Sequence, residues 1–126
     1  MARVMQLWTC QMAKWRKAKE ADIVLFDTTV KSGLPVFAPT WEMVGWIKQN
    51  PNDLDQQERY TRAYQQLMRK SWTEHRADWE YLLGLERVAI ACYCPPGQYC
   101  HRLLLKDYLI ATGERLGITV EYQGEL

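Results

Sequence analysis

The chain has 126 residues, 25% of them charged, and a net charge of +1, which is the composition of one ordinary globular domain. This near-neutral balance gives no electrostatic reason to expect nucleic acid or an anionic membrane as the main partner. No apolar run approaches the roughly 18 residues of a membrane span, and the N-terminus lacks the apolar core of a secretory signal. We therefore expect a cytoplasmic protein without a membrane partner, whose four cysteines are free thiols.

Four short apolar or β-branched stretches predict strands. They are nearly continuous rather than alternating, which is typical of strands covered on both faces. The predicted strands cover residues 4–9, 23–26, 88–92 and 118–122.

Helical patterns lie between the predicted strands. Thr40 and Asp53 each precede such a pattern and are predicted N-caps, and Thr73 is predicted to begin the fourth helix. The clearest amphipathic spacing runs over 55–71. The predicted helices cover residues 11–20, 41–47, 55–71, 73–84 and 103–110.

Strands that alternate with helices predict an α/β fold. We expect residues 1–126 to form a single Rossmann-like three-layer domain, with a mostly parallel sheet of about four strands and helices on both faces. In such sheets, ligands bind at the carboxyl ends of the strands, where the strand order reverses. The segments that follow the predicted strands are therefore the candidates for a site.

The segment 92–102 concentrates reactive side chains after a predicted strand. Three of the four cysteines lie here, and Cys100 opens a helix beside His101 and Arg102. A helix N-terminus and neighbouring cations lower a thiol pKa, so Cys100 is a candidate nucleophile, metal ligand or oxidation-prone residue, and it is our candidate catalytic thiol. The alternative is a small buried residue with an inert sulfur.

Arg102 is the strongest candidate for binding an anion. A guanidinium at a helix N-terminus opposes the helix dipole, so an anionic ligand would compensate its position. The alternative is an ion pair with a carboxylate, for which Asp27 is a candidate. Lys31 is predicted to bind the same anion.

The cysteines also invite a metal-binding interpretation. Cys92 and Cys94 would point to the same side of an extended chain. However, their spacing is not the usual two-residue knuckle, and adjacent Cys100 and His101 would diverge by about 100° on a helix. We predict no metal ligands here. The glycine spacing of a Walker loop is absent as well, and we predict no cofactor.

Two other segments follow predicted strands and carry polar groups. The segment 27–33 offers a carboxylate, three hydroxyls and an ammonium, which suit phosphate recognition, with Asp27 as a potential base. The alternative is a self-capped turn with a solvated lysine. The predicted ligand-binding residues come from these segments, from the end of the first predicted strand and from one tryptophan. They are Thr9, Cys10, Thr28, Thr29, Lys31, Ser32, Trp41, Cys94, His101 and Arg102.

Three stretches stand out together, namely 27–33, 37–44 and 94–105, the last of which contains the sequence Cys-His-Arg. They resemble the YeaO-like small proteins, catalogued as domain of unknown function 488, in a branch common in bacteriophages and bacteria. The resemblance implies a Rossmann-like domain in the cytosol, which would be the host's for a viral protein, and it implies no reaction. The matching positions are Asp27, Thr28, Lys31, Ser32, Cys94, Cys100, His101 and Arg102.

One departure from the resemblance concerns the first strand. Other members often continue with a Gly-His-Ser-type turn, whereas this chain has Thr9-Cys10-Gln11. This difference leaves the role of the first loop open.

Three functions remain open at this point. In the first, the domain binds a phosphorylated or nucleotide-derived ligand at the strand ends, and a viral version would sequester a host nucleotide signal. In the second, it is an enzyme on that ligand, with Cys100 or Asp27 reacting and Arg102 stabilising negative charge. In the third, a metal stabilises a module for protein partners. Most of the many aromatic residues are expected to fill the core, and others suit a ligand cleft or a subunit interface, so self-association is a further expectation.

Overall fold

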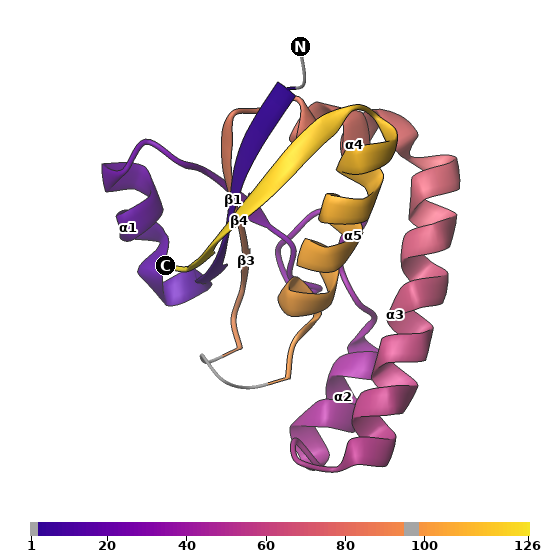
Figure 1. Cartoon of the computed structure of the whole chain (residues 1–126). Helices are drawn as coiled ribbons and strands as arrows, with labels where there is room; N and C mark the ends of the chain where they lie inside the picture. The colour runs from indigo at the N-terminus through magenta and orange to yellow at the C-terminus, as the bar shows by residue number, and fades with distance from the viewer. Residues whose placement is uncertain (1–2, 95–98) are drawn as a thin grey trace.

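The computed structural model describes residues 3–94 and 99–126 (Figure 1). Its helices and strands follow the predicted order, with a short 3-10 turn, η1 (Met12–Lys14), before the first helix. The elements are β1 (Arg3–Gln11), α1 (Trp15–Glu20), β2 (Val24–Asp27), α2 (Trp41–Gln49), α3 (Leu54–Glu74), α4 (Arg76–Leu83), β3 (Arg87–Cys92), α5 (His101–Arg115) and β4 (Ile118–Glu125).

The four strands form one sheet in the order β2-β3-β1-β4, and every neighbouring pair is parallel. The predicted α/β fold is therefore confirmed. β3 is buried along nearly its whole length, whereas the edge strand β4 is buried only at alternate positions of its first half. A continuous apolar run thus marks a central strand, as parallel sheets require.

Helices cover both faces of the sheet, with α1 on one side and α3, α4 and α5 on the other (Figure 1). Successive side chains of a strand point to opposite faces. In β3, Val88 and Ile90 pack in the large core, whereas Ala89 and Ala91 join a small cluster with Ala18 of α1. Small residues on this face let the six-residue α1 lie close to the sheet.

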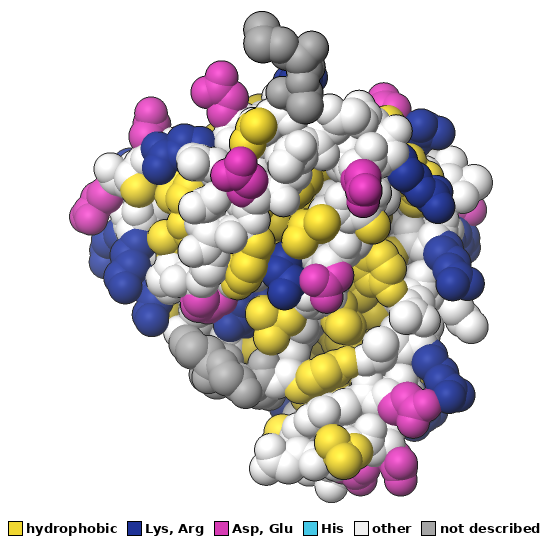
Figure 2. All heavy atoms as spheres, in the orientation of Figure 1, with side chains coloured by type: hydrophobic (Ala, Val, Ile, Leu, Met, Phe, Trp, Pro, Cys, Tyr) yellow, Lys and Arg dark blue, Asp and Glu magenta, His cyan; other side chains and the backbone are white. Residues whose placement is uncertain are grey.

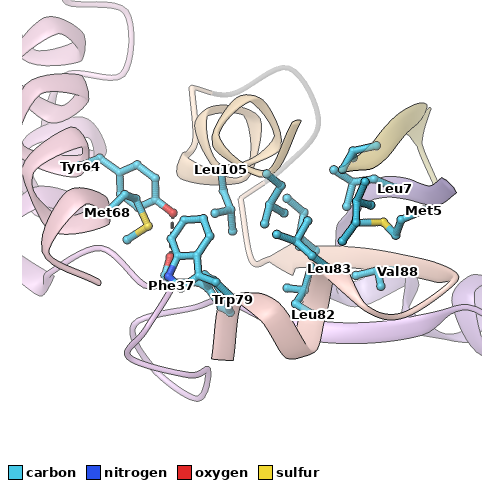
Figure 3. Close-up of a cluster of buried hydrophobic side chains, with 14 of the residues drawn as sticks. Met5, Leu7, Phe37, Tyr64, Met68, Trp79, Leu82, Leu83, Val88 and Leu105 are labelled. Atoms are coloured by element: carbon cyan, nitrogen blue, oxygen red, sulfur yellow. Dashed lines mark hydrogen bonds between the residues drawn. The ribbon is translucent and has the colours of Figure 1, made fainter. Parts of the chain in front are cut away.

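The large core joins the sheet to the long excursion between β2 and β3. Figure 3 shows Met5 and Leu7 of β1 near one end of this cluster and Tyr64 of α3 near the other, with side chains of α4 and α5 between them. Tyr64 Oη donates to the carbonyl of Phe37 at 2.8 Å, and the Ser71 hydroxyl donates to the carbonyl of Val36 at 2.6 Å. These bonds hold the chain before α2 against α3, so α2 and α3 keep a fixed position beside the sheet.

The helix ends confirm two predictions and correct one. Thr40 Oγ1 accepts from the amide of Met43, and Asp53 Oδ1 accepts from the amide of Asp55, so both predicted N-caps are present. The prediction that Thr73 begins a new helix is wrong. Its hydroxyl donates to the carbonyl of residue 69 within α3, and α4 begins only at Arg76.

Two strands run further than the sequence predicts. β1 continues to Gln11, so the predicted first loop, 9–11, lies inside the sheet. β4 continues to Glu125 through a bulge at which the pairing with β1 shifts. Gly124 has a φ of +111°, which favours glycine, and its place at the bulge lets Glu125 pair beside Thr9.

Charged side chains of both signs are spread over the face drawn in Figure 2, as the near-neutral composition predicts. None of the helices within the described ranges is both long and apolar enough to cross a bilayer.

Candidate functional site

The carboxyl ends of β2 and β3 open into a pocket of about 370 Å³. Because the chain leaves β1 towards α1 and leaves β3 towards α5, on the other face, the topological switch point lies between β1 and β3, beside this pocket. The pocket takes its walls from the β2 loop, α2, α3 and the segment around the start of α5. Its lining residues are Thr29, Val30, Lys31, Pro39, Trp41, Val44, Ile47, Lys48, Tyr60, Cys92, Tyr93, Cys94, Tyr99 and His101.

The lining combines flat apolar walls with a few charged or reactive groups. Its aromatic residues come from three different helices and loops, and Trp41 is 64% exposed. Lys31 and Lys48 supply positive charge, whereas the sulfurs of Cys92 and Cys94 lie at the end of β3. Apolar pockets with a small number of polar groups are typical of small-molecule sites.

The Asp27 carboxylate is held inside its own turn. Oδ1 accepts from the amide and the hydroxyl of Thr29 at 2.9 and 2.6 Å, and Oδ2 accepts from the hydroxyl of Ser32 at 2.5 Å. Burial favours the neutral acid, but these hydrogen bonds outweigh it and lower the pKa of Asp27. The carboxylate therefore shapes the loop, and its role as a base stays a prediction.

Gly33 closes this turn by a near approach of backbone to backbone. Its amide donates to the carbonyl of Thr29 at 2.9 Å, and a Cβ at this position would overlap the Asp27 carbonyl and the Thr29 amide. Glycine is thus the residue that lets the loop fold back and keep Lys31 at the pocket.

His101 is buried, and its neighbours fix its tautomer. The Thr28 hydroxyl gives its proton to the carbonyl of Ala91 at 2.8 Å, so its oxygen can only accept from the ring. His101 Nε2 lies 2.9 Å from that oxygen and 2.8 Å from the Thr28 carbonyl. Two acceptors require a proton on Nε2. Burial lowers the pKa of His101, so the ring is neutral and Nδ1 carries a lone pair.

Three thiols gather beside this histidine. The Sγ atoms of Cys92, Cys94 and Cys100 all lie within 4.8 Å of one another, and those of Cys92 and Cys100 are 2.7 Å apart. Cys100 is buried and its Sγ lies 3.6 Å from His101 Nδ1, whereas Cys94 is only half-buried and lines the pocket. We call these three residues the thiol cluster.

The lowered thiol pKa lies at a different cysteine from the one predicted. Hydrogen bonds from Cys100 and Cys92 lower the pKa of Cys94 to about 3, and the same contacts raise the pKa of Cys100. Arg102 Nη1 lies 2.7 Å from Cys92 Sγ. The negative charge therefore belongs to the thiol cluster as a unit, with Cys94 as its accessible member. The expected acidification of Cys100 is not found, because its contacts with Cys92 and Cys94 and its burial raise its pKa.

Arg102 lies behind the pocket lining. Its guanidinium is 1% exposed, and it donates from Nε and Nη2 to the two carboxylate oxygens of Glu125 at 3.2 and 3.0 Å. Asp27, the carboxylate that the sequence offered as a partner, bonds within its own turn instead. Arg102 also donates to the carbonyl of Cys94 at 3.1 Å, so it joins the thiol cluster to β4.

The first strand contributes nothing to the described lining. Thr9 Oγ1 shares a hydrogen bond of 2.6 Å with Tyr122 Oη, and Cys10 is buried on the face that α1 covers. Ser32 contacts the pocket indirectly, through a bond of 3.0 Å to the hydroxyl of Tyr93. Of the predicted ligand-binding residues, those that line the pocket are Thr29, Lys31, Trp41, Cys94 and His101.

Sequence reasoning missed much of the pocket wall. Tyr93 and Tyr99 lie within the cysteine-rich segment 92–102, and their position there was an available signal. Tyr60 carried only the signal of a core residue on an amphipathic helix, and Lys48 carried none. Their place in the pocket depends on how α2 and α3 pack, which no local pattern encodes.

The donor set of the thiol cluster could in principle hold a soft metal ion. Three thiolates are a common zinc environment. Here, however, a guanidinium nitrogen already lies against Cys92 Sγ, and a cation placed among the sulfurs would face it at short range. The arrangement suits one shared negative charge better than three.

A family model described as the active DUF488-N3 subclade matches residues 4–113. The match spans the Asp27 turn, the thiol cluster and Arg102, and it ends before β4. No curated protein and no solved structure matches the chain. The family model covers most of the sequence, in agreement with the resemblance of the segments 27–33, 37–44 and 94–105. The chain therefore belongs to the DUF488 family, in the DUF488-N3 subclade.

Proposed function

We propose that the pocket binds a small planar ligand with an anionic group, of the phosphorylated or nucleotide-derived class. One observation carries this proposal. Aromatic walls and two lysines line a single pocket at the carboxyl ends of two parallel strands, beside the switch point of the sheet.

The aromatic walls favour a flat ring in the ligand. Trp41, in the first turn of α2, lines the pocket yet exposes 64% of its surface, which leaves a large apolar ring for a partner to cover. Stacking of a base on an aromatic side chain contributes about 1–3 kcal/mol. Tyr60 and Tyr99 meet edge to face, with ring centroids 5.8 Å apart, and form a firm wall.

The charged groups favour an anionic end and set its orientation. Lys31 and Lys48 line the pocket, and a lysine ammonium binds phosphate as a point charge. The thiol cluster carries negative charge, so it would repel a phosphate placed beside it. Arg102 is already paired with Glu125. The anionic group should therefore lie at the two lysines and the ring against the aromatic wall.

Binding measurements on the reduced protein test this proposal. We would titrate nucleoside mono-, di- and triphosphates, nucleosides, sugar phosphates and inorganic phosphate by calorimetry. We expect nucleotides to bind more tightly than either the nucleoside or inorganic phosphate alone. The double substitution Lys31→Ala and Lys48→Ala should weaken nucleotide binding at least about tenfold, which corresponds to about 1.4 kcal/mol.

Matched variants separate the pocket from the general surface. Trp41→Ala should weaken binding, whereas Trp15→Ala, another partly exposed tryptophan, should not, because Trp15 lies on α1 across the sheet. Lys19→Ala and Lys17→Ala on α1 serve as the control for the two lysines. If no compound of the panel binds, or if the α1 variants lose as much affinity as the pocket variants, the proposal fails.

A second candidate is an enzyme on the same class of ligand, because Cys94, a thiolate in its surroundings, lines the same pocket. Incubation of the bound ligand followed by chromatography distinguishes the two. A product that forms with the native protein but not with Cys94→Ser supports an enzyme. A ligand recovered unchanged supports binding alone, which would suit the sequestration of a nucleotide signal.

A further inference from the structure

We propose that the thiol cluster is a hydroperoxide-reactive redox site, in which Cys94 is oxidised first and Cys100 then forms a disulfide with it. This activity does not depend on the identity of the ligand that the pocket binds.

The access of the three sulfurs differs in the way that such a site requires. Cys94 is half-buried and lines the pocket, so a small oxidant can reach its sulfur. Cys100 is 2% exposed, and its Sγ lies within 4.8 Å of Cys94 Sγ. A disulfide needs the sulfurs at about 2.05 Å, so a modest movement joins them. The accessible thiol of Cys94 can therefore react with the oxidant, and the buried thiol of Cys100 lies close enough to form the disulfide afterwards.

Arg102 favours a negative charge on the thiol cluster. It donates to Cys92 Sγ and to the Cys94 carbonyl, so a buried cation lies against the cluster. Cations beside a thiol favour the thiolate, which is the nucleophile. The same guanidinium pairs with Glu125 through its other edge, so the thiol cluster and this carboxylate share one cation.

His101 adds a base at the second sulfur. The two acceptors at Nε2 place the proton there and leave the Nδ1 lone pair 3.6 Å from Cys100 Sγ. This is a nucleophile and base pair, in which the Thr28 hydroxyl and carbonyl orient the ring. A buried thiol with a raised pKa needs such a base before it can attack.

The chemistry balances with one hydroperoxide molecule. The Cys94 thiolate attacks an oxygen of the peroxide, an S–O bond forms, the O–O bond breaks, and the leaving oxygen takes a proton. The sulfur becomes a sulfenic acid, oxidised by two electrons, and the peroxide is reduced. Cys100 passes its proton to His101 Nδ1 and attacks Cys94 Sγ. An S–S bond forms, the S–O bond breaks, and hydroxide leaves with that proton as water.

Cys92 offers Cys100 a second disulfide partner. Its Sγ lies 2.7 Å from that of Cys100, so thiol–disulfide exchange can move the bond to the buried pair and return Cys94 to a thiolate. In either form Cys100 is part of the disulfide.

The test starts from reduced native protein and one equivalent of hydrogen peroxide. We expect two of the four thiols to disappear and the intact mass to fall by that of two hydrogens. Peptide mapping should place Cys100 in the disulfide. Cys94→Ser should lose the rapid reaction. Cys100→Ser should instead hold a sulfenic acid at Cys94 that dimedone traps, and this variant should fold, because serine is a favoured N-cap and residue 100 is the N-cap of α5.

Two further variants sharpen the assignment. Cys10→Ser should react like the native protein, because Cys10 belongs to the cluster under α1. His101→Gln, which keeps a donor towards Thr28, should slow disulfide closure about 100-fold but leave sulfenic acid formation unchanged. A structural role alone would change both steps together.

Several results would overturn the proposal. One is a rate with peroxide that Cys94→Ser leaves unchanged. Another is a disulfide that survives Cys100→Ser but vanishes in Cys92→Ser. A third is native protein that contains stoichiometric zinc on all three thiols and loses no thiol to peroxide.

Discussion

The carboxyl edge of the sheet has two halves that behave differently. At the ends of β1 and β4, pairing continues to Glu125, and the Leu126 amide donates to the Thr9 carbonyl at 2.8 Å. At the ends of β2 and β3, the loop after β2, the start of α5 and the helices α2 and α3 enclose a pocket. The sequence predicted polar groups at three strand ends, yet only two of these ends build the pocket. A strand end becomes a site where pairing stops and the following segments diverge.

Arg102 connects the two halves, and its loss should have the largest effect on stability. It pairs with Glu125 of β4 and donates to two residues of the thiol cluster. Removing one partner of a buried pair costs about 3–5 kcal/mol. We therefore expect Arg102→Ala to lower the free energy of unfolding by about 3 kcal/mol in urea denaturation.

Arg62→Ala is the control for this prediction. Arg62 pairs with Glu58 on the exposed side of α3, and such pairs contribute about 0.3–0.5 kcal/mol. Equal losses in the two variants would show that the connection between the halves contributes little.

A methyl group at Gly33 should affect only the half of the edge that holds the pocket, at the ends of β2 and β3. A Cβ there would overlap backbone atoms of Asp27 and Thr29, and they cannot move without opening the turn. We expect Gly33→Ala to cost about 2 kcal/mol and to weaken ligand binding. Gly45→Ala adds a methyl group in open space within α2 and should stabilise the protein by about 0.5 kcal/mol. Thermal unfolding of both variants measures the difference, and a stabilised Gly33→Ala would contradict it.

Two buried threonines allow a direct comparison of the halves. Thr28 bonds to Ala91 and His101 in the interior, whereas Thr9 bonds to the hydroxyl of Tyr122, which is 37% exposed. We expect Thr28→Val to cost about 1.5 kcal/mol and Thr9→Val about 0.5 kcal/mol, because water can replace the second bond. Only Thr28→Val, which removes an acceptor that orients His101, should slow the disulfide closure by Cys100. Equal slowing of this closure in Thr9→Val would contradict the comparison.

The smallest expected effect is a lack of pH dependence. Hydrogen bonds from Cys100 and Cys92 lower the pKa of Cys94 to about 3, so the thiol cluster carries its negative charge well below neutral pH. The rate at which iodoacetamide alkylates Cys94 should therefore be constant between about pH 5 and pH 8. The alkylation rate of a free thiol rises about tenfold for each pH unit in that range. Cys94→Ser provides the background rate. A rate that climbs to pH 8 would place the charge on another sulfur.

Local patterns predicted most of the fold. The apolar run 88–92 marked the central strand because burial on both faces leaves no room for alternation. Thr40 and Asp53 marked helix starts because their side chains satisfy free amides. Such signals lie within a few residues of the feature that they specify.

The site required information that no local pattern holds. The partner of Arg102, Glu125, lies 23 residues further along the chain and beyond Gly124. In a sequence, a glycine at this position suggests the end of a strand rather than a bulge within it. The position of the lowered thiol pKa depends on which sulfur the others surround. Lys48 lines the pocket only through the packing of α2 on α3. Each of these depends on contacts between distant segments.

The pairing of Arg102 with Glu125 has a consequence for the order of events during synthesis. When Arg102 is added to the growing chain, the carboxylate that pairs with its guanidinium is still 23 residues from being added. Until β4 joins β1, the nascent chain holds a cation in a region that later becomes buried. The reactive sulfurs should therefore reach their final environment among the last steps of folding, and a chaperone or an oxidant in the cell would meet them before that.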